Sequence, residues 1–291
     1  EVITSAKSFI ASVGAIVHVG ARPVLVDVSD DLNINVDLIE GKITKKTKAI
    51  MPVHWTGRVC DMDKINRLAK KYKLLVIEDS AQGMGSYYKG RHAGTLSATA
   101  GFSCHPLKNL NALGDSGYLV TKSKRIYEKV KLYRNHGLAR RDDVRVFGVN
   151  SRLDSLNASV LSLRLTKLKK IIKKRRYNIN IYRERLSDLK DVIIPKDNKN
   201  EFSSYVMFIN RFRNRDKLQQ FLSEKNIQSL IYYGTPLHKH VASLKLGLDT
   251  GDLHNSEKIC KEVLALPHHQ NLTENQINYV CDNILKFYKT H

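Results

Sequence analysis

The stretch that decides the fold is FSCHPLKNLNALGDSG, residues 102–117. It continues an apolar run that begins at Ala98, so it lies where a buried strand is expected to end. Ser103, His105 and Lys108 follow within six positions, and then comes a loop with two glycines and an aspartate. In a chain this rich in lysine, spacing alone favours a surface loop here, and a binding site is the alternative.

Short apolar runs alternate with helical patterns over residues 1–121. The runs have strand length and are mostly apolar, as strands are when both faces of a sheet are covered: EVI, PVLVDV, AIMPVHW, LLVIED, ATAGFSC and GYLVT. Helical spacing lies between them in FIASVGAIVHVG, DLIEGKI and DMDKINRLAKKYK. This alternation predicts a mostly parallel, doubly wound α/β sheet.

The pattern changes after Lys122. We expect a helix over 124–134, a polar loop, and a long helix that begins near Asp154, whose side chain can cap it. Leu156, Leu163 and Leu168 belong to an apolar stripe on the long helix. Its basic run KKIIKKRR is interpreted as a solvated helix face.

A smaller α+β part is expected towards the C-terminus. SYVMFINRF and IQSLIYY predict strands, RDKLQQFLSEKN predicts a helix, and two helices close the chain, the last with Thr273 and Gln276 in capping-box spacing. We therefore predict a large α/β domain over 1–150, and a connecting helix with a small α+β domain over 151–291.

Composition restricts the class of protein. The chain has 291 residues, 42% of them hydrophobic, with no apolar run long enough to span a membrane and no signal-peptide pattern. Four scattered cysteines are interpreted as reduced thiols of a cytoplasmic protein, and no metal-binding spacing is apparent. The net charge of +21 is compatible with nucleic acid, an anionic membrane surface or an anionic small substrate, but it is spread along the chain. It therefore resembles a compositional bias, and we expect neither nucleic acid nor membrane as a partner.

Polar residues follow three of the apolar runs, at 54–57, 79–82 and 103–108. In open α/β sheets, ligands bind at the carboxyl ends of the strands. The residues there suit pyridoxal 5'-phosphate (PLP), which needs a lysine for a Schiff base, a carboxylate for its ring nitrogen, and hydroxyl or N–H groups for its phosphate. A strand-end turn at Asp79 and a surface lysine at 108 are the alternatives that spacing alone leaves open.

A resemblance to a known family rests on an ordered series of segments. VIEDSAQGMGSYYKGRHAG and GFSCHPLKNLNALGDSGYLVT are followed by YRNHG, GVNSRLDSLNA, TPLHKH and LALPHHQNLTENQ. This series resembles the DegT/DnrJ/EryC1/StrS family of PLP-dependent nucleotide-sugar aminotransferases. The resemblance runs through nearly the whole chain and implies the PLP-dependent transferase fold of type I, with a mostly parallel sheet in its large domain.

The resemblance also implies roles for single residues. Lys108 would be the catalytic lysine that binds PLP covalently and moves protons, Asp79 would pair with its ring nitrogen, and Gln82 would hold the ring from one side. Ser103 would bind the phosphate and Phe9 would stack on the ring.

Further roles depend on loops and on a second subunit. Asn150 would reach the phosphate in the neighbouring subunit, because the family forms its sites at a homodimer interface. His136, Tyr232 and His238 are candidate substrate contacts. The implied reaction moves an amino group, usually from glutamate, to a keto sugar linked to a nucleotide diphosphate, for amino-sugar or surface-polysaccharide biosynthesis.

Some segments depart from the family pattern. The chain begins after the Ser-Gly-Thr loop that supplies phosphate contacts in the family, so we expect it to be N-terminally incomplete. Tyr232, Tyr233 and Gly234 stand where the family has His-Tyr-Pro, and Lys7 stands where it often has an uncharged residue. A truncated, non-catalytic or regulatory relative that keeps the fold is therefore the alternative. Lys108 argues against the dehydratase branch, which has a histidine at that position.

Overall fold

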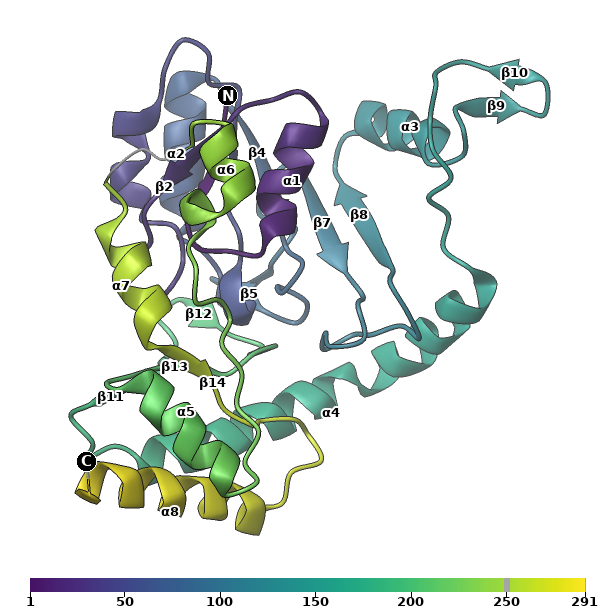
Figure 1. Cartoon of the computed structure of the whole chain (residues 1–291). Coiled ribbons are helices and arrows are strands. Elements are labelled where there is room, and N and C mark those ends of the chain that lie inside the picture. Colours follow the sequence, from purple (N-terminus) through teal and green to yellow (C-terminus); the bar gives the residue numbers. More distant parts are fainter. Residues whose placement is uncertain (249–251, 291) are drawn as a thin grey trace.

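One six-stranded sheet forms the centre of the N-terminal part in a computed structural model that describes residues 1–248 and 252–290 (Figure 1). Its strands are β1 (Val2–Ser5), β2 (Pro23–Val26), β3 (Ala49–Met51), β4 (Leu75–Asp79), β7 (Thr99–Ser103) and β8 (Gly117–Thr121), in the spatial order β2-β1-β3-β4-β7-β8. All neighbours are parallel except β8, which runs antiparallel to β7. The mostly parallel sheet predicted from the alternating pattern is confirmed.

Helices cover both faces of this sheet. Successive strand residues point to opposite faces, so the neighbours Leu25 and Val26 enter different cores. Leu25 packs with Val13 of α1 (Ile10–His18), whereas Val26 packs with Ile65 of α2 (Met62–Tyr72). Because both faces are buried, the strands read as nearly continuous apolar runs.

Local sequence fixes the ends of α2. The side chain of Asp61 accepts a hydrogen bond from the backbone N–H of Lys64, which satisfies one of the free donors of the first turn. Ile65 and Ala69, four residues apart, form the buried face. Lys73 ends the helix in the left-handed conformation with φ of 54°. The chain then enters β4, the strand that carries Asp79.

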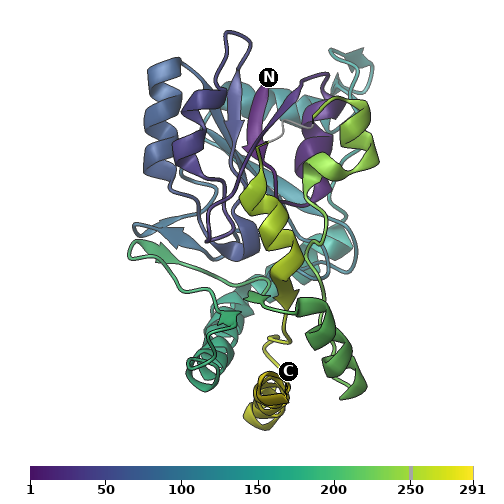
Figure 2. The ribbon, with the colours of Figure 1, turned by 60° about the vertical axis from the view of Figure 1, so that its left-hand side comes forward.

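A second core lies below the sheet in Figure 2, between three helices and a three-stranded sheet. The helices are α4 (Ser155–Arg185), α5 (Arg215–Glu224) and α8 (Glu274–Thr290), and the strands are β11 (Val192–Ile193), β13 (Ile209–Phe212) and β14 (Val263–Ala265). Tyr182, Phe208, Leu222 and Ile284 are among its fully buried members. The predicted capping box at α8 is confirmed, since the side chains of Thr273 and Gln276 each accept the other's backbone N–H.

The remaining elements join these two parts or project from them. They are helix α3 (Lys124–Tyr133), the hairpin β9 (Leu138–Arg140) and β10 (Asp143–Val144), the small sheet of β5 (Tyr87–Tyr88), β6 (Arg91–His92) and β12 (Glu201–Phe202), helices α6 (Val241–Lys245) and α7 (His254–Glu262), and the turns η3 (Trp55–Gly57) and η4 (Leu237–Lys239). Leu237, Leu248 and Leu253 return to pack beside Leu25, on the large sheet. Residues after 150 thus contribute both to the smaller core and to a core of the large sheet. The domain boundary at residue 150 stays a prediction.

Three predicted elements differ from the observed ones. DLIEGKI forms two 3-10 turns, η1 (Val36–Leu38) and η2 (Glu40–Lys42), because so short a segment gains few helical bonds for the cost of nucleation. In SYVMFINRF only β13 is a strand. IQSLIYY is not a strand: Leu230 makes one isolated bridge to Ala265, and the tyrosines turn towards a cavity.

The long helix α4 also corrects two details. Asp154 takes the N-cap position, but its side chain makes no capping hydrogen bond. Leu168 is buried as the apolar stripe predicts, whereas Leu156 and Leu163 are 68% and 60% exposed. The first half of α4 therefore presents an apolar face that the described residues of this chain leave uncovered.

Candidate active site

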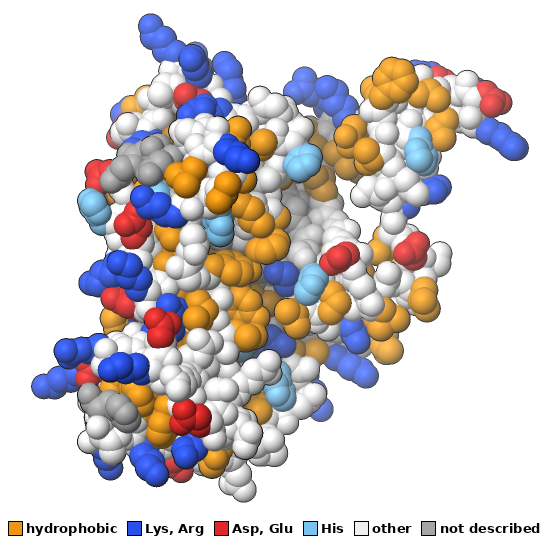
Figure 3. Space-filling view, in the orientation of Figure 1, with side chains coloured by type: hydrophobic (Ala, Val, Ile, Leu, Met, Phe, Trp, Pro, Cys, Tyr) orange, Lys and Arg blue, Asp and Glu red, His pale blue; other side chains and the backbone are white. Residues whose placement is uncertain are grey.

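A cavity of about 790 Å³ opens at the carboxyl ends of the parallel strands, where the sheet meets the smaller core. Its lining includes Phe9, Asp79, Gln82, Ser103 and Lys108, which come from the last residues of three strands or from the segments that follow them. Figure 3 shows hydrophobic side chains gathered where the upper and lower parts of the molecule meet. The fold thus brings these five predicted site residues, and Tyr232 as a sixth, to one cavity.

Asp79 ends β4 and is held by two donors. Its Oδ2 accepts a hydrogen bond from Ser12 Oγ at 2.7 Å, and its Oδ1 accepts one from the backbone N–H of Ala81 at 3.1 Å. Ser12 lies 3.1 Å from Ser8 Oγ. Because an ionised carboxylate only accepts, Ser12 donates to Asp79 and receives its own hydrogen bond from Ser8. The three side chains form a directed chain of hydrogen bonds along the cavity wall.

Lys108 follows β7 in a turn that is fixed at both ends. Its backbone N–H donates to the carbonyl of His105 at 2.8 Å, and the next residue, Asn109, donates from Nδ2 to the carbonyl of Ser204 at 3.2 Å. Burial lowers the pKa of the Lys108 ammonium, while the nearby carboxylate of Asp79 partly restores it. The neutral, nucleophilic amine is therefore more accessible at neutral pH than in a surface lysine.

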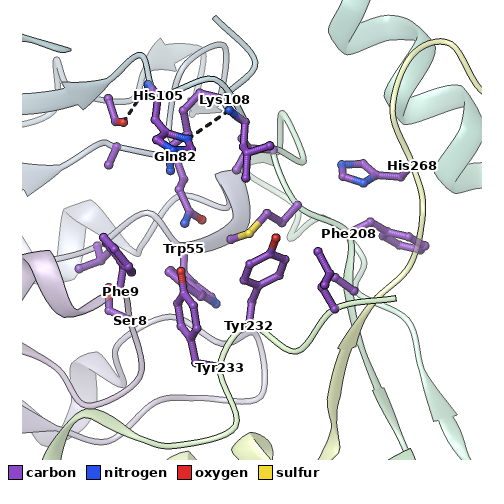
Figure 4. Close-up of a pocket in the computed structure, with 18 of the residues that line it drawn as sticks. Ser8, Phe9, Trp55, Gln82, His105, Lys108, Phe208, Tyr232, Tyr233 and His268 are labelled. Atoms are coloured by element: carbon purple, nitrogen blue, oxygen red, sulfur yellow. Dashed lines mark hydrogen bonds between the residues drawn. The ribbon is translucent and has the colours of Figure 1, made fainter. Parts of the chain in front are cut away.

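Gln82 is oriented by the backbone of the neighbouring strand end. Its Oε1 accepts a hydrogen bond from the backbone N–H of Thr56 at 2.5 Å. Thr56 has a φ of 61°. Because the oxygen is occupied, the donating NH₂ group is left for the cavity. Figure 4 shows Gln82, His105 and Lys108 on one side of the cavity and the two tyrosines, Tyr232 and Tyr233, on the other.

An aromatic group lines the lower wall. Tyr233 lies 5.8 Å from Phe9 and 5.7 Å from Trp55, measured between ring centroids (Figure 4). Phe9 is 51% exposed, although it is a large hydrophobic side chain on a cavity wall. Such a ring is available to stack on a flat ligand. On the opposite side, Ser103 Oγ accepts the N–H of His105 at 3.3 Å, so its own O–H can donate to a ligand.

A lysine, a carboxylate and aromatic rings thus share one cavity, and comparison of the sequence with known families identifies the family of the chain. A model of the DegT/DnrJ/EryC1/StrS aminotransferase family matches residues 1–285. The chain belongs to this family. The expected fold class is confirmed too, since the crystal structure of DesV from S. venezuelae in complex with a ketimine intermediate superposes with a TM-score of 0.95 at 33% identity, covering 98% of this chain and 77% of that one.

Curated relatives in the family carry both enzymatic and regulatory names. The dTDP-3-amino-3,6-dideoxy-alpha-D-galactopyranose transaminase of Aneurinibacillus thermoaerophilus is 38% identical over 290 residues, which cover 99% of this chain and 78% of the relative. A pleiotropic regulatory protein of Geobacillus stearothermophilus is 39% identical over 295 residues, with 99% and 78% covered.

The structure places three of the predicted site residues away from the cavity of this family member. Asn150 pairs with Asn135 in an isolated bridge beside the β9–β10 hairpin, and His136 is exposed next to it. His238 is buried elsewhere and bonds Glu257 through Nε2 at 2.9 Å. Tyr232, by contrast, lines the cavity. Asn150 was predicted to act in a neighbouring subunit, and that role stays a prediction.

Other residues of the site were not singled out from the sequence. Ser8 and Ser12, which line the cavity, were missed. They lie four residues apart, between the end of β1 and the first turns of α1, and this spacing indicates side chains on one face. The stretch 54–57, which the sequence placed after a strand, contributes Trp55 to the cavity, whereas His54 is fully buried and bonds Glu78 at 2.9 Å.

The interpretation of the basic run KKIIKKRR as a solvated face is corrected at one position. Lys169, Lys170 and Lys173 are exposed, but Arg175 is only 9% exposed and lines the cavity. Within the described residues, no group of three or more potential metal ligands gathers, and no helix is long and apolar enough to cross a membrane.

Proposed function

We propose that the chain is a PLP-dependent aminotransferase that moves an amino group from an amino acid, with glutamate as the expected donor, to a keto sugar linked to a nucleotide diphosphate. The residues present fit the cofactor. A half-buried lysine amine, an oriented carboxylate, a serine hydroxyl and an exposed aromatic ring line one cavity, and these are the groups that PLP requires.

Each residue has a proposed role towards the cofactor. Lys108 binds it covalently, and Asp79 holds its ring nitrogen in the protonated form. Ser103 binds the phosphate, Gln82 donates to an oxygen of the ring, and Phe9 excludes water from one face of the ring. When bound, PLP supplies an electron sink for the carbon that carries the amino group.

Lys108 also acts as the acid and base of the reaction in this proposal. Its Nζ would take a proton from the carbon that carries the donor's amino group and deliver it to the cofactor carbon that accepts the amino group. With the keto sugar, the same amine would move a proton in the opposite direction, to the sugar carbon that receives the amino group. Burial favours the neutral amine that the first step needs, and the fixed turn around His105 keeps the side chain directed to one place.

The substrate class is supported by the relatives and by charge. The Aneurinibacillus relative is named for a dTDP-linked amino sugar, and a net charge of +21 favours encounter with an anionic nucleotide sugar. We place the enzyme in the cytoplasm, in amino-sugar or surface-polysaccharide biosynthesis. The four described cysteines are buried and free, which is consistent with a reducing compartment.

We further propose a homodimer with shared sites. Hydrophobic side chains gather on the projecting part at the right of Figure 3, which carries α3 and the β9–β10 hairpin in Figure 1. Phe147, three residues after β10 in the sequence, is 97% exposed. Together with Leu156 and Leu163 of α4, these side chains offer a surface of the kind that a second subunit covers. Asn150 then reaches the partner's cofactor, which explains its distance from the cavity of its own chain.

The observation that carries the function is the presence of Lys108 and Asp79 in one cavity of a family member. The purified chain with added PLP is expected to absorb visible light, and borohydride is expected to fix the cofactor on Lys108, located by peptide mass spectrometry. Lys108→Ala should abolish both signals, and Lys124→Ala, an exposed lysine on α3, should keep both. A wild-type chain that takes up no PLP would overturn the proposal.

Complementation tests the shared sites. Mixed dimers of Lys108→Ala and Asn150→Ala chains should regain activity in amino-transfer assays with nucleotide-linked keto sugars, because one of their two sites then has both intact residues. Equal inactivity of the mixture and of the separate variants would contradict sharing.

A further inference from the structure

A buried arginine on the cavity wall has no counter-charge. Arg175 of α4 is 9% exposed and lines the same cavity as Lys108. Its Nε donates to Gln270 Oε1 at 3.2 Å and its Nη1 to the carbonyl of Val206 at 3.2 Å. Both acceptors are neutral, and no ion pair joins Arg175 to a carboxylate in residues 1–248 and 252–290; Nη2 has no acceptor there.

Other buried arginines of the chain are compensated. Arg58 pairs with Glu201 at 3.0 Å, and Arg211 pairs with Asp30 and Glu262, each at 2.7 Å. Burial alone lowers the pKa of Arg175, to about 10, so the guanidinium still carries its charge at neutral pH. A buried charge without a partner is costly, and its retention on a cavity wall points to an anion that enters the cavity.

The surroundings indicate what kind of anion fits. His268, also on this wall (Figure 4), donates from Nε2 to the carbonyl of Tyr205 at 2.9 Å, and burial together with the charge of Arg175 lowers its pKa to about 3. His269 beside it likewise has a lowered pKa. Both imidazoles are therefore neutral at pH 7, and Arg175 provides the full positive charge on this wall.

One guanidinium among apolar side chains suits one carboxylate. Met207, Phe208 and Leu266 line the cavity near His268. A guanidinium fork matches the two oxygens of a carboxylate, whereas a diphosphate carries more negative charge than a single arginine balances.

We propose that Arg175 forms a carboxylate subsite in the cavity, and that it binds the carboxylate of the amino-acid donor or of an acidic sugar. The subsite rests on the proposed function, because the carboxylate is recognised there while the rest of the same substrate faces Lys108. Arg175 is thus a specificity-determining residue, contributed by the basic run of α4.

Calorimetric titration of the full chain loaded with PLP tests the subsite with ligands that cannot react. Glutarate represents the amino-acid donor, glucuronate represents an acidic sugar, and a nucleoside diphosphate tests for phosphate binding. The variants are Arg175→Met, which keeps the stem without the charge, and Arg175→Lys. Arg176→Met is the matched control: this neighbour on α4 bonds the carbonyl of Ser203 and the carboxylate of Asp197, and it does not line the cavity.

The expected result is at least tenfold weaker binding of glutarate or of glucuronate by Arg175→Met, with a smaller loss in Arg175→Lys and none in Arg176→Met. The ligand that loses affinity identifies the source of the carboxylate. Wild-type protein that binds neither carboxylate would overturn the subsite, as would variants that bind them like wild type, or a loss confined to the nucleoside diphosphate. If Arg175→Met does not fold, Arg175→Lys carries the comparison.

The outcome separates the subsite from the proposed function. Uptake of PLP on Lys108 is read from visible absorption, separately from the titrations with carboxylates. A chain that takes up PLP but binds carboxylates independently of Arg175 keeps its function and loses the subsite. A chain that takes up no PLP loses the proposed function, and the same titrations on the cofactor-free protein then decide the subsite alone.

Discussion

Ser12 Oγ donates to Asp79 Oδ2 over 2.7 Å, and this bond joins the first helix of the chain to the end of β4. The second oxygen of Asp79 is held by the N–H of Ala81, so the carboxylate has one orientation before any ligand arrives. Ser8 completes the chain by donating to Ser12. A carboxylate fixed in this way loses less freedom when it pairs with a charged ring nitrogen.

Ser12→Ala is expected to weaken PLP binding by about one to two powers of ten, because removing a hydrogen bond to a charged group costs about 1.5 to 3 kcal/mol. Ser12→Thr keeps the hydroxyl and should bind as wild type does. The measurement is a titration of visible absorption with PLP for the three proteins. Equal affinity in wild type and Ser12→Ala would show that the Ala81 amide alone orients Asp79.

Asp79 should also control the proton on Lys108. Its negative charge partly opposes the lowering of the Lys108 pKa by burial. Asp79→Asn removes that charge and is expected to lower the Lys108 pKa further, so that the neutral amine prevails at lower pH. The pH dependence of Lys108 labelling by an amine-reactive reagent, followed by mass spectrometry in the cofactor-free protein, measures this. A labelling midpoint that stays or moves upward in Asp79→Asn would contradict the coupling.

Strand ends were predictable from the sequence because apolar runs in a covered parallel sheet are nearly continuous. That pattern located Asp79, Gln82 and Ser103 at or after strand ends, and the fold brings them to one edge. Periodicity also located α2, and capping spacing located the start of α8. These features depend on neighbours in the sequence, so the sequence pattern alone reveals them.

Features that depend on distant contacts could not be predicted in the same way. Arg175 lies in a run of basic residues, and only the packing of α4 against the smaller core shows that it is buried. Tyr232 and Tyr233 looked like a strand but turn to the cavity. Leu156 and Leu163 were expected in the core but are exposed. An apolar stripe on a helix does not reveal whether other residues of the same chain pack against it.

Lys7 should make stability depend on pH. It is 1% exposed, its Nζ donates to the carbonyl of Tyr232 at 3.0 Å, and burial lowers its pKa from 10.5 to about 8. Cys260 opposes this shift and Arg215 adds to it. Between pH 8 and 10.5, Lys7 binds a proton more often in the unfolded chain than in the folded one. Its contribution to the free energy of unfolding therefore rises as pH rises.

The expected gain from Lys7 between pH 8 and 10.5 is about 3 kcal/mol, since one pKa unit corresponds to about 1.4 kcal/mol. Lys7→Met should lack this gain, and it should be more stable than wild type at pH 7, where the buried ammonium is most costly. Urea denaturation at three pH values from neutral to alkaline gives the free energy of unfolding of each protein at each pH. Parallel curves for the two proteins would contradict the assignment.

Glu201 of β12, in the small sheet with β5 and β6, bonds Arg58 in the loop after β3 through a buried ion pair. Its side chain is 2% exposed and that of Arg58 is 4% exposed, with 3.0 Å between Oε2 and Nη2. Glu201 also accepts the N–H groups of Val59 and Asn198, and burial nevertheless raises its pKa. The cost of burying the two charges therefore offsets much of their attraction. Removing one partner should destabilise the protein more than removing both.

Glu201→Met is expected to lower the free energy of unfolding by about 3 to 5 kcal/mol, because Arg58 is left buried without a partner. Arg58→Met combined with Glu201→Met should recover most of that loss, since both charges are then gone. Denaturation of wild type, both single variants and the double variant closes the cycle. A double variant that is less stable than Glu201→Met would show that the unpaired Arg58 is not costly, and would contradict the prediction.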